Sequence, residues 1–204
     1  MKIRFKTLII SFLLLGLYSC IEDDSSTLNE DNTEVVNTNS SAIEGTWSMS
    51  SYSVSNGTVV INVTGFGNIS QSFTVSSNNY NYTETYNDDS SEVTIDGTFD
   101  VSAIIAGITT ETINHTVDTS TMDTSFLVNE WELENGNSVI ITNGDIETTY
   151  SIIEISDSIL KYTVDLSTLN ADQINIFFGD EIAERFDDGT FSSMTGDLYV
   201  TLEM

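Results

Sequence analysis

Residues 131–164, WELENGNSVIITNGDIETTYSIIEISDSILKYTV, decide the fold class of this chain. Asn135-Gly136 and Asn143-Gly144 separate short runs of β-branched and aromatic residues, and both residue types tolerate the positive φ angles of tight hairpin turns. The runs are Trp131–Leu133, Val139–Ile141, Tyr150–Ile152 and Leu160–Val164. The stretch therefore predicts an antiparallel up-and-down meander of strands.

The same pattern extends over residues 43–204, which are enough to bury a sizeable core as one domain. Asn56-Gly57 is predicted as a further hairpin turn, although neighbouring runs can also join into one strand across a bulge. The strands expected outside residues 131–164 are Thr46–Val54, Val59–Thr64, Gln71–Ser76, Tyr80–Tyr86, Glu92–Val101, Thr110–Val117 and Gly196–Leu202. The runs above extend to the expected strands Phe126–Glu134, Val139–Thr142, Ile146–Ile155 and Ile159–Asp165. The fold class is all-β.

One short helix is expected before the last strand. Asn170 can cap its start, with Gln173 as the capping-box partner, and Asp188-Gly189 ends it. Apolar residues at helical spacing between these points predict a stripe that packs on the sheet. Gly179 lies in the middle and costs about 1 kcal/mol relative to alanine, so the helix should be short or bent.

A sheet of Ser/Thr-rich strands must protect its edges, and closure into a barrel does so. Gly45-Thr46-Trp47, at the start of the first expected strand, resembles the Gly-x-Trp signature of lipocalins, and the meander is similar to the second half of bacterial lipocalin-like lipoproteins. The resemblance implies a lipocalin-like up-and-down barrel with a central cavity. Trp47 would fill the closed end, where Gly45 lets the backbone turn in. The family's arginine that packs on this tryptophan has only Arg185 as a candidate, and Arg185 lies in the expected helix.

The segment Leu17-Tyr18-Ser19-Cys20 follows a short apolar run and a start that carries Lys2, Arg4 and Lys6. This order is typical of a secretory signal peptide. The segment resembles a bacterial lipoprotein lipobox, in which the cysteine receives acyl chains such as palmitate and the peptide is cut just before it. The resemblance implies a signal peptide at 1–19 and lipidation of Cys20. An uncleaved membrane anchor is the alternative, and it would need about 20 apolar residues.

Residues 20–42 would then form a disordered acidic tether, since their composition cannot bury enough apolar surface to offset the entropy of ordering. Several acyl chains hold a protein firmly on a membrane, because each buried methylene contributes about 0.8 kcal/mol. Glu22, Asp23 and Asp24 resemble the signal that exports some lipoproteins to the surface of the outer membrane, although they also suit an ordinary tether. The expected location is the bacterial cell envelope, at the outer membrane.

The chain is strongly acidic, with 32 Asp and Glu against five Lys and Arg and a formal net charge of −27. Such a surface repels phosphate backbones, so nucleic acid is excluded as a partner. His115 is the only histidine and Cys20 the only cysteine. A His-Cys dyad and a multi-histidine metal site are therefore excluded. The chain also lacks the Gly-x-Ser-x-Gly motif of a nucleophile elbow, and His115 is expected on the polar face of its strand. A carboxylate pair is the remaining route to hydrolysis, and spacing along strands does not reveal one.

The turns Asp187-Asp188-Gly189 and Asn143-Gly144-Asp145 lack the spaced ligands of a calcium loop, so no metal and no cofactor is predicted. The leading hypothesis is a non-enzymatic lipoprotein whose barrel binds a small apolar ligand in a cavity of a few hundred Å³. Alternate residues of a barrel strand share a face. The expected lining includes Tyr150, Ile152, Leu160 and Tyr162. The rival hypothesis is a surface interaction or structural module with a filled interior; the sequence names no protein partner.

Cys20→Ala should abolish acylation and leave the precursor uncleaved at this site, because both lipid transfer and cleavage depend on the thiol. Mass spectrometry of the protein recovered from membranes checks this for the variant against the unaltered chain. An unmodified Cys20 in the unaltered chain would rule out the lipoprotein interpretation.

Overall fold

The computed structural model describes residues 42–87, 91–107, 110–122 and 127–204. The predicted signal peptide at 1–19, Cys20 and nearly all of the predicted tether lie outside the described residues. The described residues begin just before the predicted domain, which starts at Ile43.

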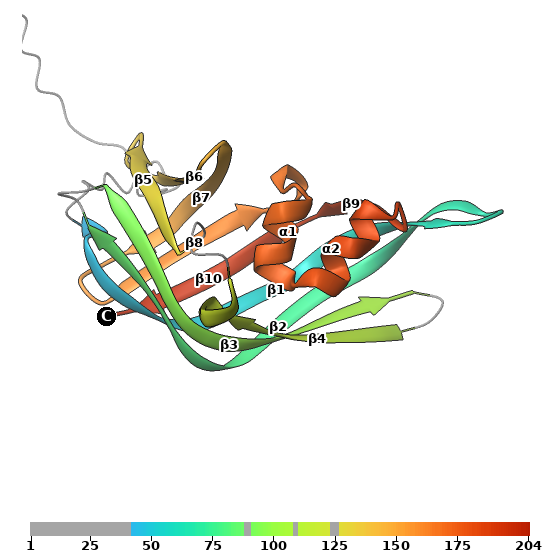
Figure 1. Ribbon diagram of the computed structural model, residues 1–204, viewed down its shortest axis with the longest axis horizontal. Helices are drawn as coiled ribbons and strands as arrows, with labels where there is room; N and C mark the ends of the chain where they lie inside the picture. Colours follow the sequence, from blue (N-terminus) through green and yellow to red (C-terminus); the bar gives the residue numbers. More distant parts are fainter. Residues whose placement is uncertain (1–41, 88–90, 108–109, 123–126) are drawn as a thin grey trace, which may run out of the picture. The chain divides into compact units, whose positions relative to one another are not determined.

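Eight antiparallel strands close into a barrel in sequence order, which confirms the all-β up-and-down architecture (Figure 1). Closure comes from the first and last of them, which pair from Ser48↔Glu203 to Ser53↔Tyr199. The eight strands are β1 (Gly45–Val63), β2 (Gly67–Asn87), β3 (Glu92–Ala106), β5 (Val128–Glu134), β6 (Ser138–Asn143), β7 (Ile146–Ile155), β8 (Ile159–Asp165) and β10 (Asp197–Glu203).

Two of the strands are much longer than the sequence pattern indicates. The expected turn at Asn56-Gly57 is wrong, because β1 continues through it to Val63 and shifts register between Val54 and Gly57. A Cβ atom at Gly57 would lie 2.8 Å from the carbonyl oxygen of Phe73, so this glycine permits close approach of two strands. β2 likewise joins two expected strands. The first hairpin thus extends beyond the barrel as an arm of paired strands.

Two shorter strands lie outside the closed ring. β4 (Thr110–Asp118) pairs with β3, and β9 (Phe191–Thr195) pairs with the far half of β1. The pattern of residues 191–195 does not predict β9, because the two buried residues, Phe191 and Met194, are three positions apart and do not alternate. β9 forms through its ladder with β1.

The single expected helix consists of two short helices, α1 (Ala171–Phe178) and α2 (Asp180–Asp187). The predicted capping box is present at the start of α1, where Asn170 accepts from Gln173 N at 3.0 Å and Gln173 Oε1 accepts from Asn170 N at 2.8 Å. Gly179 separates the two helices with a φ of 86°, outside the helical region. In the part of the chain that the structure describes, no helix has the length and apolarity needed to cross a bilayer.

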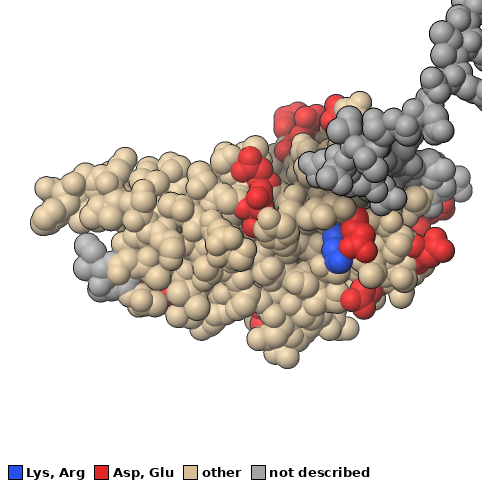
Figure 2. Space-filling view, turned by 180° about the vertical axis from the view of Figure 1, so that it is seen from behind, with Lys and Arg blue, Asp and Glu red and all other residues tan. Residues whose placement is uncertain are grey.

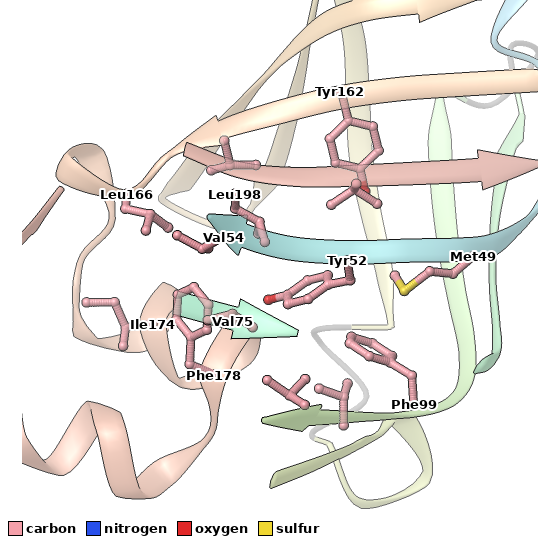
Figure 3. Close-up of a cluster of buried hydrophobic side chains, with 14 of the residues drawn as sticks. Met49, Tyr52, Val54, Val75, Phe99, Tyr162, Leu166, Ile174, Phe178 and Leu198 are labelled. Carbon is pink, nitrogen blue, oxygen red and sulfur yellow. The ribbon is translucent and has the colours of Figure 1, made fainter. Parts of the chain in front are cut away.

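The barrel is tightly packed at the end where β1 begins. Trp47 is 0 % exposed there, and its indole nitrogen donates to the carbonyl of Ile43 at 2.7 Å. Tyr86 and Trp131 meet edge to face with ring centroids 5.4 Å apart. Gly45 has a φ of 130°, and a Cβ atom there would lie 2.9 Å from Met204. Figure 3 shows the core continuing toward the helices, where Tyr52, Ile174 and Phe178 point toward one another.

Trp47→Ala should lower the free energy of unfolding by about 3 to 5 kcal/mol, because it leaves a cavity at a fully buried aromatic site. Urea denaturation of the full chain measures the loss. Ser48→Ala, at the exposed neighbouring position, is the control and should change the free energy by less than about 0.5 kcal/mol. Equal midpoints for the two variants would show that Trp47 does not support the barrel.

Candidate functional site

A cavity of about 90 Å³ lies inside the barrel, and every strand of the closed ring contributes to its wall. It is smaller than the few hundred Å³ expected, because aromatic side chains and α1 fill much of the interior. The apolar wall includes Met49, Val93, Phe99, Ile141 and Val200. Polar side chains also line it: Glu84, Asn129, Asn143, Thr148, Gln173 and four tyrosines.

Glu84 is the charged residue among the described residues that line this cavity. It lies on β2, is 5 % exposed, and accepts hydrogen bonds from two tyrosine hydroxyls. Tyr162 donates to Oε1 and Tyr86 to Oε2, each at 2.8 Å. Burial raises the pKa of Glu84 above its ordinary value, and the two hydrogen bonds oppose that rise by favouring the charged form.

The sequence of β2 explains how a carboxylate reaches the interior. Tyr82, Glu84 and Tyr86 alternate with Thr83 and Thr85, so the period of two places the tyrosines and the glutamate on the inner face. Sequence reasoning missed Glu84 because it treated the acidic residues as solvated. The pattern Tyr-Thr-Glu-Thr-Tyr is the signal that would have identified it.

Four tyrosines line the cavity together with Glu84: Tyr52, Tyr82, Tyr150 and Tyr162. Burial raises the pKa of each hydroxyl, so all four remain protonated in neutral solution. The rings of Tyr150 and Tyr162 are 4.8 Å apart, and those of Tyr82 and Phe99 are 5.2 Å apart. The hydroxyls of Tyr82 and Tyr150 have no hydrogen-bond partner among the described residues, which leaves them available to a ligand.

α1 forms part of the wall through Gln173, Ile176 and Phe177. Gln173 Nε2 donates to the hydroxyl of Thr148 at 2.7 Å and to the carbonyl of Glu147 at 3.0 Å, both on β7. The hydroxyl of Tyr52 donates to the carbonyl of Phe177. These bonds hold the helix against the barrel interior, so the cavity depends on the position of α1.

The predicted lining residues divide into two pairs. Tyr150 and Tyr162 line the cavity. Ile152 and Leu160 pack in the hydrophobic core instead, with Leu160 1 % exposed. Leu160 is opposite Leu202, toward the packed Trp47 end, whereas Ile152 is opposite Tyr162 at the level of the cavity and packs against the core there.

The positions of Arg185 and His115 both differ from those expected from the sequence. Arg185 bonds to Glu111 and Glu181 and lies 5.4 Å from the ring of Phe191, so it does not take the place of an arginine on Trp47. His115 is not on the polar face of β4: two-residue alternation puts it on the face of Ile113 and Val117. There it packs beside Gly179, where a Cβ atom would lie 2.5 Å from the imidazole.

In residues 42–87, 91–107, 110–122 and 127–204, no three His, Cys, Asp or Glu residues gather as a metal site would require.

No protein-family model, no curated protein and no solved structure matches this chain. The assignment of function therefore depends on the sequence motifs and on the geometry of the cavity.

Glu84→Gln should become progressively more stable than the unaltered protein as pH rises from about 4.5, the ordinary value for a glutamate pKa. Because burial raises the pKa, the folded protein holds this proton more tightly than the unfolded chain does. The bound proton therefore stabilises the folded protein. This stabilisation is complete below the ordinary pKa and is lost as pH rises through the raised pKa of the folded state. Glutamine has no such proton to lose.

Urea denaturation at a series of pH values measures the free energy of unfolding of the variant and of the unaltered protein. Taking the difference between the two removes the contribution of the other acidic groups. Glu132→Gln is the matched control at an exposed glutamate, and its difference should stay nearly constant with pH. If the difference in free energy of unfolding for Glu84→Gln also stayed constant with pH, Glu84 would not be a buried carboxyl group with a raised pKa.

Proposed function

We propose that this chain is a lipid-anchored lipoprotein of the bacterial cell envelope whose barrel binds a small, largely apolar molecule. The observation that carries the binding proposal is the cavity, which combines apolar walls with a few polar groups around Glu84. Small-molecule sites are typically concave and apolar, with a small number of polar groups that orient the ligand.

The anchoring part of the proposal rests on the N-terminal sequence. Lys2, Arg4 and Lys6 precede an apolar run that ends in Leu17-Tyr18-Ser19-Cys20, the lipobox-like segment. The outer membrane is the proposed location, and the acidic residues after Cys20 are the proposed export signal. The burial of Trp47 at the packed end of the barrel supports the lipocalin-like interpretation of the Gly45-Thr46-Trp47 motif.

A surface interaction module is the second candidate function, and a specific observation favours it. Residues 45–83 contain no charged side chain, although the chain as a whole is strongly acidic. These residues form most of the first hairpin, and Phe66 is 84 % exposed at its turn. Figure 2 shows the end of the molecule at the left of the view without acidic or basic colour. Such a surface could contact another protein without charge repulsion.

Titration calorimetry with hexanol distinguishes the two candidates, because hexanol is a small apolar probe with one neutral polar group. The full chain should bind it saturably at one site. Val200→Phe places a larger side chain on the cavity wall and should abolish binding. Val128→Phe is the matched control, since Val128 is 48 % exposed on the outside of β5, and it should bind as the unaltered chain does.

Native mass spectrometry of the full chain purified from its membranes provides a second measurement and should detect a stoichiometric small molecule. Absence of both hexanol binding and a copurified molecule would favour the interaction module with a filled barrel.

A further inference from the structure

We infer that the cavity selects a small organic cation, an amine or a quaternary ammonium group carried on an apolar body, with Glu84 as its counter-ion. This inference rests on the proposed ligand-binding function and narrows it to one class of ligand.

The first support is that the described residues supply no positive partner for Glu84. Among the described residues that line the cavity, no lysine, arginine or histidine faces this carboxylate. A buried carboxylate without a counter-ion is costly, and an apolar residue of similar volume would stabilise the barrel more. A ligand that carries the positive charge would supply the missing partner.

The second support is the remaining hydrogen-bonding capacity of the site. Each carboxylate oxygen of Glu84 accepts one tyrosine hydroxyl, whereas an ionised carboxylate can accept about four hydrogen bonds. The bonds from Tyr86 and Tyr162 fix the orientation of the carboxylate and favour its charged form. The hydroxyls of Tyr82 and Tyr150 can accept further bonds from an ammonium group, since neither has a partner among the described residues.

The third support is the aromatic character of the wall. Besides Phe177 on α1, five aromatic rings on different strands line the cavity that contains the carboxylate. Aromatic rings attract organic cations through their quadrupoles, most strongly where water is excluded. The five rings are those of Tyr52, Tyr82, Phe99, Tyr150 and Tyr162. An aromatic wall with a single carboxylate suits an ammonium group attached to carbon, because the rings contact its apolar part as well.

Other ligand classes fit these residues less well. An anion would be repelled by Glu84. Calcium takes about six to eight oxygen ligands, and no group of three acidic or imidazole side chains lies together in the described part of the chain. The formal net charge of −27 also concentrates cations around the protein and opposes the approach of anions.

Titration calorimetry with three probes of the same apolar body tests the inference on the unaltered full chain: hexylammonium, hexanol and hexanoate at neutral pH. Hexylammonium should bind at least about tenfold more tightly than hexanol, because it gains the ion pair and the cation–π contacts. Hexanoate should show no binding. The comparison needs no variant, so it does not depend on how a mutant folds.

Glu84→Gln should weaken hexylammonium binding at least about tenfold, and it should weaken hexanol binding much less, since only the cation uses the charge. Glu132→Gln is the matched control and should leave both affinities unchanged. In the unaltered chain, hexylammonium binding should weaken as pH falls and Glu84 becomes protonated. The titratable groups that face Glu84 are Tyr82, Tyr86, Tyr150 and Tyr162, and their raised pKa values keep them protonated throughout.

The outcomes separate this inference from the function on which it rests. Equal binding of hexanol and hexylammonium, with no effect of Glu84→Gln, would overturn the cation preference while leaving a ligand-binding barrel. Binding of none of the three probes would overturn both. Preferential binding of hexanoate would also overturn the cation preference.

Discussion

The pairing of β1 with β10 is the interaction on which the rest of the structure depends. It joins the first and last strands of the barrel and so turns a long sheet into a closed wall. Closure brings the inner faces of distant strands together. The hydroxyl of Tyr162 reaches Glu84, 78 positions away in the sequence, only because the ring is complete. Without this ladder, the same carboxylate would lie on an open sheet in water.

The barrel interior changes in character along its axis. At the Trp47 end it is filled by large apolar side chains, as a stable core requires. Between this end and α1 it contains the carboxylate of Glu84, which is opposite Trp47 in the β1–β2 ladder, together with tyrosine hydroxyls and empty space. A buried acid with a raised pKa lowers the stability of the folded state in neutral solution. The tightly packed part of the interior therefore provides the stability that allows a less favourable arrangement beside it.

The parts of the fold that local sequence determines could be predicted, whereas those set by tertiary contacts could not. β7 and β8 have the expected limits because alternation and the turns at Asn143-Gly144 and Asp157-Ser158 define them locally. Asn56-Gly57 has the same composition as the Asn-Gly turns, yet it lies inside β1, where the ladder to β2 and the ladder to β9 that begins at Thr58 outweigh the turn preference. Two of the four expected cavity residues line the site. Glu84 was missed because its burial follows from the tyrosines beside it and not from its own polarity.

The uncharged first hairpin has a consequence for how contacts of this molecule would respond to ionic strength. Contacts made by the acidic parts of the surface would change with salt, since screening acts on exposed charges. Residues 45–83 carry no charge to screen. An association through this arm would depend on hydroxyl and amide hydrogen bonds and on the exposed ring of Phe66. It would therefore depend little on the screening of charges by salt.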